Sequence, residues 1–178
     1  SSKFSAYNLV NEYSEEEISK LIYEYGEERH ARKIARYIVE ARKIKPIATT
    51  FELSDLVKRA AGPSKNKHPA KKTFQAIRIA VNRELDVLIE AIDKAVALLK
   101  KGGRLGIITF HSLEDRIVKQ RFKELEKGCT CPPDIPMCIC GKKPLLKIIT
   151  KKPLTAEKAE LEDNNRAHSA KLRIVERV

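Results

Sequence analysis

The segment Gly102–Arg116, GGRLGIITFHSLEDR, contains the signals that decide the fold. Its apolar run Leu105–Phe110 predicts a short buried strand that follows a glycine pair. Ser112 is a natural N-cap, and the acidic residues that follow it suit the first turn of a helix, where the helix dipole favours negative charge. We therefore predict a strand that passes directly into a helix, with His111 and Ser112 at the junction.

The residues before this segment predict helices, and those after it predict further strands. Capping-box sequences begin helices at Ser14 and Thr49, and Gly26 is predicted to be the C-cap of the first of these. Further helices are predicted over about Glu27–Lys43 and Thr73–Leu99, with a break near Asn82 in the second. Strands are predicted over residues 145–151 and 170–178, with a short helix after Thr155. The fold class is therefore α/β, with a helical domain over residues 1–99 and a mixed domain over 100–178.

The charge distribution indicates a polyanionic partner. The chain has 178 residues and a net charge of +12, and residues 58–83 contain eight Lys or Arg and no acid. An acid-free stretch favours phosphate binding, although a solvated basic surface has the same composition. The apolar runs are too short for a bilayer span, and the start of the chain does not have the pattern of a signal peptide. We expect a cytoplasmic location, because the four cysteines lie in one loop and not in a disulfide framework.

Two groups of polar side chains are candidates for RNA binding. The first follows the Thr73 helix and the basic loop before it, and we put RNA contact slightly ahead of an exposed polar face for Lys67, His68, Lys71, Lys72, Gln75, Arg78 and Asn82. The second lies on the Glu27 helix and comprises Arg29, Arg32, Lys33 and Arg36. Ion pairs with Glu28 and Glu40 are an equally good interpretation of this second group.

Four cysteines form a C-x-C…C-x-C pattern at Cys129, Cys131, Cys138 and Cys140. Four thiolates on a tight loop can hold Zn²⁺ tetrahedrally, and such a closed site is structural. The alternatives are thiols that bind no metal and adventitious disulfides.

The junction at His111 and Ser112 does not match the motifs of known hydrolytic sites. A nucleophile elbow would need Gly-x-Ser-x-Gly, and a zinc deaminase would need H-x-E with C-x-x-C, neither of which occurs here. No strand is followed by a Gly-rich turn that could hold a nucleotide. The two residues remain candidates for a position near a catalytic site, and the catalytic residues themselves are unassigned.

Four segments closely resemble the MraW (RsmH) family of S-adenosylmethionine-dependent methyltransferases. They are TFQAIRIAVNREL (73–85), KKGGRLGIITFHSLEDRIVKQRF (100–122), LKIITKKPL (146–154) and NRAHSAKLRIVERV (165–178). The resemblance implies an enzyme that methylates N4 of a cytidine in bacterial 16S ribosomal RNA. It also implies the C-terminal part of a class I, Rossmann-like methyltransferase sheet, with an inserted all-α substrate-recognition domain. The last strand would then lie antiparallel between the other two.

The same resemblance places the S-adenosylmethionine site in an amino-terminal half that precedes Ser1, so we expect no cofactor-binding residue here and an inactive fragment. The strand Leu105–Phe110 would then be an exposed edge, which predicts a homodimer or another chain that covers it. From a different class, the alternative function is a non-enzymatic RNA-binding module with a structural zinc loop.

Overall fold

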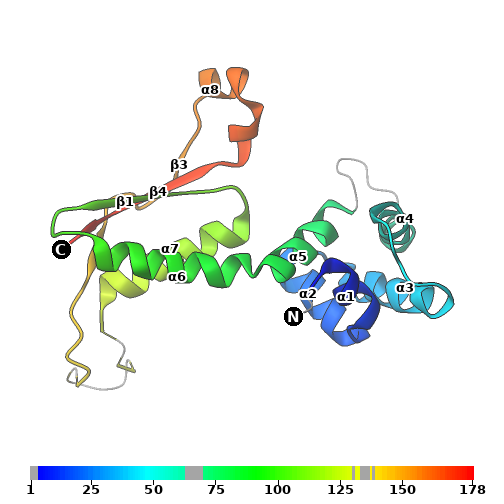
Figure 1. Ribbon diagram of the computed structural model, residues 1–178. Coiled ribbons are helices and arrows are strands. Elements are labelled where there is room, and N and C mark those ends of the chain that lie inside the picture. The colour runs from blue at the N-terminus through cyan, green and yellow to red at the C-terminus, as the bar shows by residue number, and fades with distance from the viewer. Residues whose placement is uncertain (1–3, 63–69, 130, 133–136, 138) are drawn as a thin grey trace. The chain divides into compact units, whose positions relative to one another are not determined.

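The computed structural model describes residues 4–62, 70–129, 131–132, 137 and 139–178. The chain forms two compact units, Ser1–Glu84 and Leu85–Val178 (Figure 1). Among the described residues, no helix combines the length and the apolar character that crossing a bilayer requires. The predicted domain boundary at residue 99 concerns the architecture of a whole enzyme and stays a prediction.

The first unit is helical. Its described helices are α1 (Ala6–Glu12), α2 (Glu15–Gly26), α3 (Ala31–Ile44), α4 (Thr50–Ala61) and α5 (Lys71–Asn82). The predicted capping boxes at Ser14 and Thr49 are confirmed, and a further one at Ser5 begins α1, which we did not predict. One apolar face of each helix contributes to a common core that includes Leu9, Ile22, Ile38, Val57 and Ile77.

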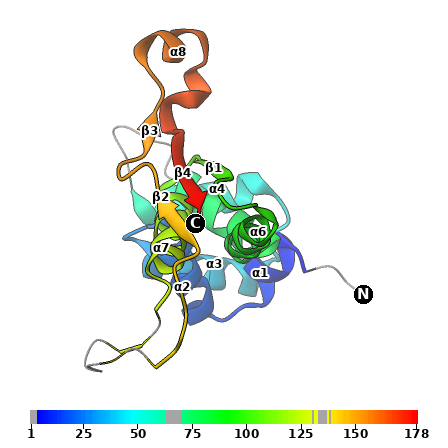
Figure 2. The ribbon, with the colours of Figure 1, turned by 90° about the vertical axis from the view of Figure 1, so that its left-hand side faces the viewer.

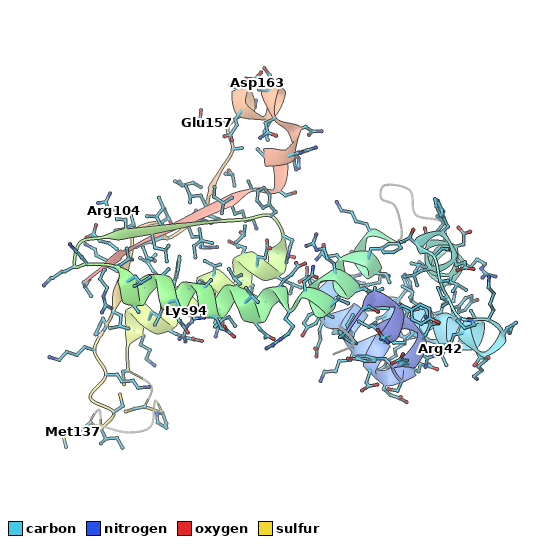
Figure 3. The ribbon with its side chains drawn as sticks, viewed as in Figure 1. Arg42, Lys94, Arg104, Met137, Glu157 and Asp163 are labelled. Atoms are coloured by element: carbon cyan, nitrogen blue, oxygen red, sulfur yellow. The ribbon has the colours of Figure 1, made fainter. Side chains whose placement is uncertain are left out.

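Arg42, labelled in Figure 3, joins α3 to α1. Its guanidinium donates hydrogen bonds to the carbonyl oxygens of Val10 and Tyr13. These carbonyls lie at the carboxyl end of α1, where they have no partner within the helix. Arg42 is therefore a structural cation, in contrast to the exposed cations near the other end of α3.

Gly26 does not have its predicted role. It is the last residue of α2, and Glu27 is the C-cap, in a left-handed conformation with φ 50°. Gly26 is buried, and a Cβ placed on it would come within 2.7 Å of the carbonyl oxygen of Lys72 in α5. The glycine is required for the close approach of two helices, because the atom it faces is fixed backbone.

The second unit is an antiparallel sheet covered by helices. It contains α6 (Glu84–Leu98), β1 (Arg104–Thr109), α7 (Ser112–Lys127), β2 (Leu146–Ile148), β3 (Leu154–Thr155), α8 (Lys158–Asp163), the 3₁₀ helix η1 (Asn165–Ser169) and β4 (Lys171–Arg177). The strand order is β1-β4-β2, and β3 also pairs with β4. The prediction that the last strand lies antiparallel between the other two is confirmed. The short pairing of β3 was not predicted.

Helices α6 and α7 cover one face of this sheet (Figures 1 and 2). Their inner residues Ile92, Val96, Val118 and Phe122 pack with Leu146 and Val175 of the strands. A bidentate ion pair also joins the two helices, with Arg121 nitrogens 2.7 and 2.8 Å from the carboxylate oxygens of Asp93. On the other face of the sheet, Ile108 and Leu154 are more than half exposed, as is Phe110 just after β1. The sheet is therefore covered by described residues on one side.

Candidate functional site

The basic residues of the α2–α3 region form the clearest candidate interface. Arg32, Lys33 and Arg36 lie exposed on α3. Arg29 precedes the helix, which begins at Ala31 and not at Glu27 as predicted. The reason for the later start is local: the buried Glu28 side chain accepts a hydrogen bond from the His30 amide at 3.0 Å and stabilises a turn.

The predicted partners of these cations are engaged elsewhere. The Glu28 carboxylate holds the His30 amide and lies 3.9 Å from the Lys72 ammonium, and Glu40 pairs with Lys43 at 2.8 Å. Within the part of the chain that the structure describes, Arg29, Arg32, Lys33 and Arg36 form no ion pair. The Lys33 ammonium lies over the Tyr37 ring, 5.8 Å from its centroid. Contact of these four cations with RNA stays a prediction.

A groove of about 730 Å³ lies between α2 and α3 beside these cations. Lys20, Tyr23, Arg29 and Arg32 line it, and Glu15, Glu16, Ser19 and Ala31 complete its wall. Tyr23 is 64% exposed, so its side chain is accessible for stacking. An open aromatic ring with cations beside it can stack an unpaired base and bind its phosphate. Tyr23 and Lys20 were not among the predicted residues, although Tyr23 falls outside the apolar Ile18–Ile22 face of its helix.

Most of the predicted RNA-binding residues on α5 form hydrogen bonds within the protein. Lys72 and Gln75 donate to the carbonyl oxygens of Glu27 and Tyr25, at 2.8 and 3.2 Å. They thereby satisfy carbonyls at the carboxyl end of α2. The Arg78 guanidinium binds both oxygens of Glu84, and Asn82 donates to the same carboxylate. RNA contact by these four residues stays a prediction. Lys71 is exposed, and Lys67 and His68 lie outside the described residues.

The junction between β1 and α7 differs from the prediction in one respect. His111, not Ser112, is the N-cap: its backbone is extended, and its Nδ1 accepts from the Glu114 amide at 3.3 Å. Glu114 in return accepts from the amides of Phe110 and His111. The Nε2 atom of the same ring is buried and lies 3.2 Å from Glu114 Oε1, but it forms no hydrogen bond with the described residues. The role of His111 and Ser112 near a catalytic site stays a prediction.

A buried ion pair that the sequence did not reveal fixes α7 to the sheet. Arg173 of β4 donates to both oxygens of Asp115 in the first turn of α7, at 2.7 and 3.0 Å. The Arg173 hydrogen bonds outweigh the opposing effect of burial and hold the pKa of Asp115 below its ordinary value of 3.8. The ammonium of Lys171, 3.7 Å from the same carboxylate, acts in the same direction.

The structure brings three of the four predicted cysteine ligands together. The sulfur atoms of Cys129, Cys131 and Cys140 all lie within 4.8 Å of one another. Cys138 lies outside the described residues.

The features above describe a mixed α/β chain with an antiparallel sheet and a basic, aromatic groove on a helical unit. The model of the MraW methylase family matches residues 1–178. The chain therefore belongs to the MraW methylase family.

Curated relatives agree with this assignment. The chain is 65% identical over 176 residues to the ribosomal RNA small subunit methyltransferase H of Fusobacterium nucleatum, an alignment that covers 99% of the chain and 56% of the relative. It is 58% identical to the protein of the same name from Clostridium botulinum strain Loch Maree, covering 98% and 57%. It is 55% identical to the protein of the same name from Caldicellulosiruptor saccharolyticus, in an alignment that covers 99% of the chain and 58% of the relative. The chain thus spans a little over half the length of these relatives.

Proposed function

We propose that the chain is the carboxyl-terminal part of an enzyme that transfers a methyl group from S-adenosylmethionine to N4 of a cytosine in 16S ribosomal RNA. The family match over all 178 residues carries this proposal. The curated relatives, which are methyltransferases of small-subunit ribosomal RNA by name, support it. The proposal implies a cytoplasmic enzyme, and it ranks above the non-enzymatic RNA-binding module because the match is to a family of methylases.

The sheet supports the proposed place of this chain in a class I methyltransferase. The edge strand β1 pairs only with β4 among the described strands, and the uncovered face carries Ile108 and Leu154. Such an edge and face need further chain or a second copy to cover them. In our proposal, the cofactor-binding half of the enzyme covers them, and the cofactor contacts lie in that half.

In this proposal, the described residues bind the RNA substrate and the rest of the enzyme binds the cofactor. S-adenosylmethionine, when bound by the rest of the enzyme, supplies an electrophilic methyl group. The cytosine must leave its stack so that its amino nitrogen can approach that methyl group in line. In the α2–α3 groove, Arg29 and Arg32 would hold phosphates while Tyr23 stacks a nearby base. The groups that receive the proton from the amino nitrogen are unassigned.

An activity measurement tests the reaction. The full-length protein is incubated with isotopically labelled S-adenosylmethionine and unmethylated small subunits, and the digested nucleosides are identified by mass spectrometry. We expect label on N4 of cytidine. Label on another atom, or none under conditions where the relatives are active, would contradict the proposed specificity. The chain alone should bind RNA and should neither bind S-adenosylmethionine tightly nor methylate RNA, whereas tight cofactor binding would contradict its proposed place.

A pair of matched variants tests the groove. In the full-length protein, Arg29→Ala with Arg32→Ala should lower rRNA affinity about tenfold and reduce the salt dependence of log K by roughly 1 for each lost phosphate contact. Lys43→Ala with Lys58→Ala removes the same charge from lysines already paired with Glu40 and Asp55, and should have a much smaller effect. Equal losses in the two variants would show that net charge, not the groove, determines binding. Cofactor affinity should be unchanged in both.

A further inference from the structure

The loop between α7 and β2 gathers sulfur atoms from both of its ends. Cys129 follows α7 by two residues, and Cys140 lies eleven residues further along the chain. Their sulfur atoms are nevertheless 3.8 Å apart, and the sulfur of Cys131 lies within 4.8 Å of both. All three side chains are partly buried. Residues that are distant in sequence thus present three soft ligand atoms to one point.

The Cys140 thiol donates a hydrogen bond to the Cys129 sulfur, and the separation of these two sulfurs is also the one that a metal site requires. In a tetrahedral zinc site with Zn–S bonds of about 2.3 Å, two sulfurs are about 3.8 Å apart. A disulfide would need a separation of about 2.05 Å, so the Cys129–Cys140 separation of 3.8 Å is not that of a disulfide. Thiolate ligands favour Zn²⁺ over the hard cations Mg²⁺ and Ca²⁺, which take oxygen ligands.

The backbone at the base of the loop holds the ligands in place. The Gly128 amide donates to Glu124 at 3.0 Å and the Leu145 amide donates to Leu125 at 2.9 Å, so both ends of the loop are fixed to the last turns of α7. Gly128 has φ 66°, and a Cβ placed on it would come within 2.5 Å of the Lys143 backbone. Only glycine fits between these two segments. A closed base lowers the conformational entropy that a metal must overcome to organise the loop.

We propose that Cys129, Cys131 and Cys140 supply three of the four ligands of a structural Zn²⁺ ion that closes this loop. The fourth cysteine predicted from the sequence, Cys138, lies outside the described residues. Each thiol loses its proton on binding, so zinc affinity rises with pH as the protons are released to solvent. The positive charges of Lys127, Lys142 and Lys143, which lie close to the ligands in sequence, offset the negative charge of the thiolates. The proposal is independent of the reaction that the enzyme catalyses.

The first test needs no variant. The full-length protein is purified under reducing conditions, freed of metal with a chelator and titrated with Co²⁺, which reports its ligands by absorption. We expect a saturable thiolate-to-cobalt charge-transfer band and tetrahedral d–d bands at one ion per chain, both abolished by one equivalent of Zn²⁺. Octahedral, weakly absorbing cobalt or no saturation would overturn the proposal. So would mass spectrometry that shows disulfides in the protein as isolated from reducing cells.

Variants then assign the ligands. Cys129→Ser, Cys131→Ser and Cys140→Ser should each lower the zinc content, measured by elemental analysis, from about one ion per chain to a small fraction. Met137→Leu is the matched control, because Met137 is a sulfur-containing residue of the same loop that is 77% exposed (Figure 3). It should keep its zinc. Zinc retained by all three serine variants would overturn the site. Far-UV circular dichroism identifies any variant that has failed to fold, and the cobalt titration of the wild type then decides.

Discussion

The ion pair between Asp115 and Arg173 should be the most sensitive polar contact in the second unit. It joins α7 to the central strand β4, and the side chains are only 13% and 8% exposed. Removing one partner of such a buried pair leaves the other charge without compensation, which typically costs about 3–5 kcal/mol. The expected losses of folding free energy are therefore large for single substitutions at either position.

The structure predicts different costs for the two substitutions. Asp115→Asn leaves the Arg173 guanidinium buried without its carboxylate, so it should cost about 3–5 kcal/mol. Arg173→Met leaves Asp115 with the Lys171 ammonium 3.7 Å away, so its cost should lie near the lower end, about 3 kcal/mol. Because each single substitution already removes the whole pair, the double variant should lose about 2–3 kcal/mol less than the sum of the two.

Urea unfolding followed by far-UV circular dichroism measures these changes, since the chain has no tryptophan. Glu176→Gln is the matched control, because Glu176 lies on the same strand and pairs with Arg104, whose side chain is 66% exposed. The control should cost less than about 1 kcal/mol. Hydrogen exchange at the β4 amides locates the effect in the second unit. Single-variant losses equal to that of the control, or strictly additive losses in the double variant, would refute the reasoning.

The pH dependence of the same variant gives a second readout. The folded-state pKa of Asp115 is lower than its ordinary value of 3.8, so the folded protein binds this proton less tightly than the unfolded chain does. The stabilisation is therefore fully present above the unfolded pKa and is lost as the pH falls through the folded one. The stability difference between wild type and Asp115→Asn should shrink as the pH is lowered from neutral to below 3.8. A difference that stays constant would show that the carboxylate is not the source of the stability.

Two further substitutions test local features. Gly26→Ala should destabilise the first unit by about 1–2 kcal/mol in thermal unfolding despite the better helix propensity of alanine, because the added Cβ meets the Lys72 carbonyl oxygen at 2.7 Å. Lys20→Ala, on an exposed position of the same helix, is the control, and a more stable Gly26→Ala would contradict the packing argument. His111→Ala should cost about 0.5–2 kcal/mol through loss of the α7 cap, whereas His111→Asn should retain most of that stability. An equal loss in both would show that capping is not its structural role.

The helices and strands were predictable because their signals are local. The capping boxes at Ser14 and Thr49 fixed two helix starts, and the apolar run before His111 fixed β1 to within one residue at each end. The antiparallel position of β4 came from the family resemblance, because strand order depends on contacts between residues far apart in the sequence. The short β3 has only two residues and offers no periodicity to detect.

The sequence contains a signal for the true N-cap of α7, which is His111 and not Ser112 as predicted. Glu114 lies three residues after His111, which is the capping-box spacing, but histidine is not among the usual N-cap residues. Gly26 illustrates a different ambiguity, since a glycine at the end of a helical pattern suits both a C-cap and a close helix contact. The Asp115–Arg173 pair joins residues 58 positions apart, so no local pattern could reveal it.

The candidate RNA-binding residues show the same limit. Periodicity grouped polar residues of α3 and α5, although Arg29 precedes α3, and it could not show what each group faces. On α5, the carbonyls of α2 and the carboxylate of Glu84 occupy Lys72, Gln75 and Arg78. On α3, the expected acidic partners bind other groups: Glu28 accepts from the His30 amide and Glu40 pairs with Lys43. Arg32 is exposed. The difference comes from the positions of neighbouring helices, which the sequence does not specify locally.

The order of apolar and polar residues in β1, within the segment Gly102–Arg116, bears on the proposed place of this chain in a larger enzyme. A strand with one solvated face alternates apolar and polar residues, whereas a strand covered on both faces is a nearly continuous apolar run. In β1, Leu105 and Ile107 face α6 and α7, and Ile108 faces the opposite side with 58% of its surface exposed. The strand thus has the composition of one that is buried on both sides, while the described helices cover one. Because the relatives are nearly twice as long, we propose that the second cover is the cofactor-binding half of the same enzyme, with a second copy of this chain as the alternative when that half is absent.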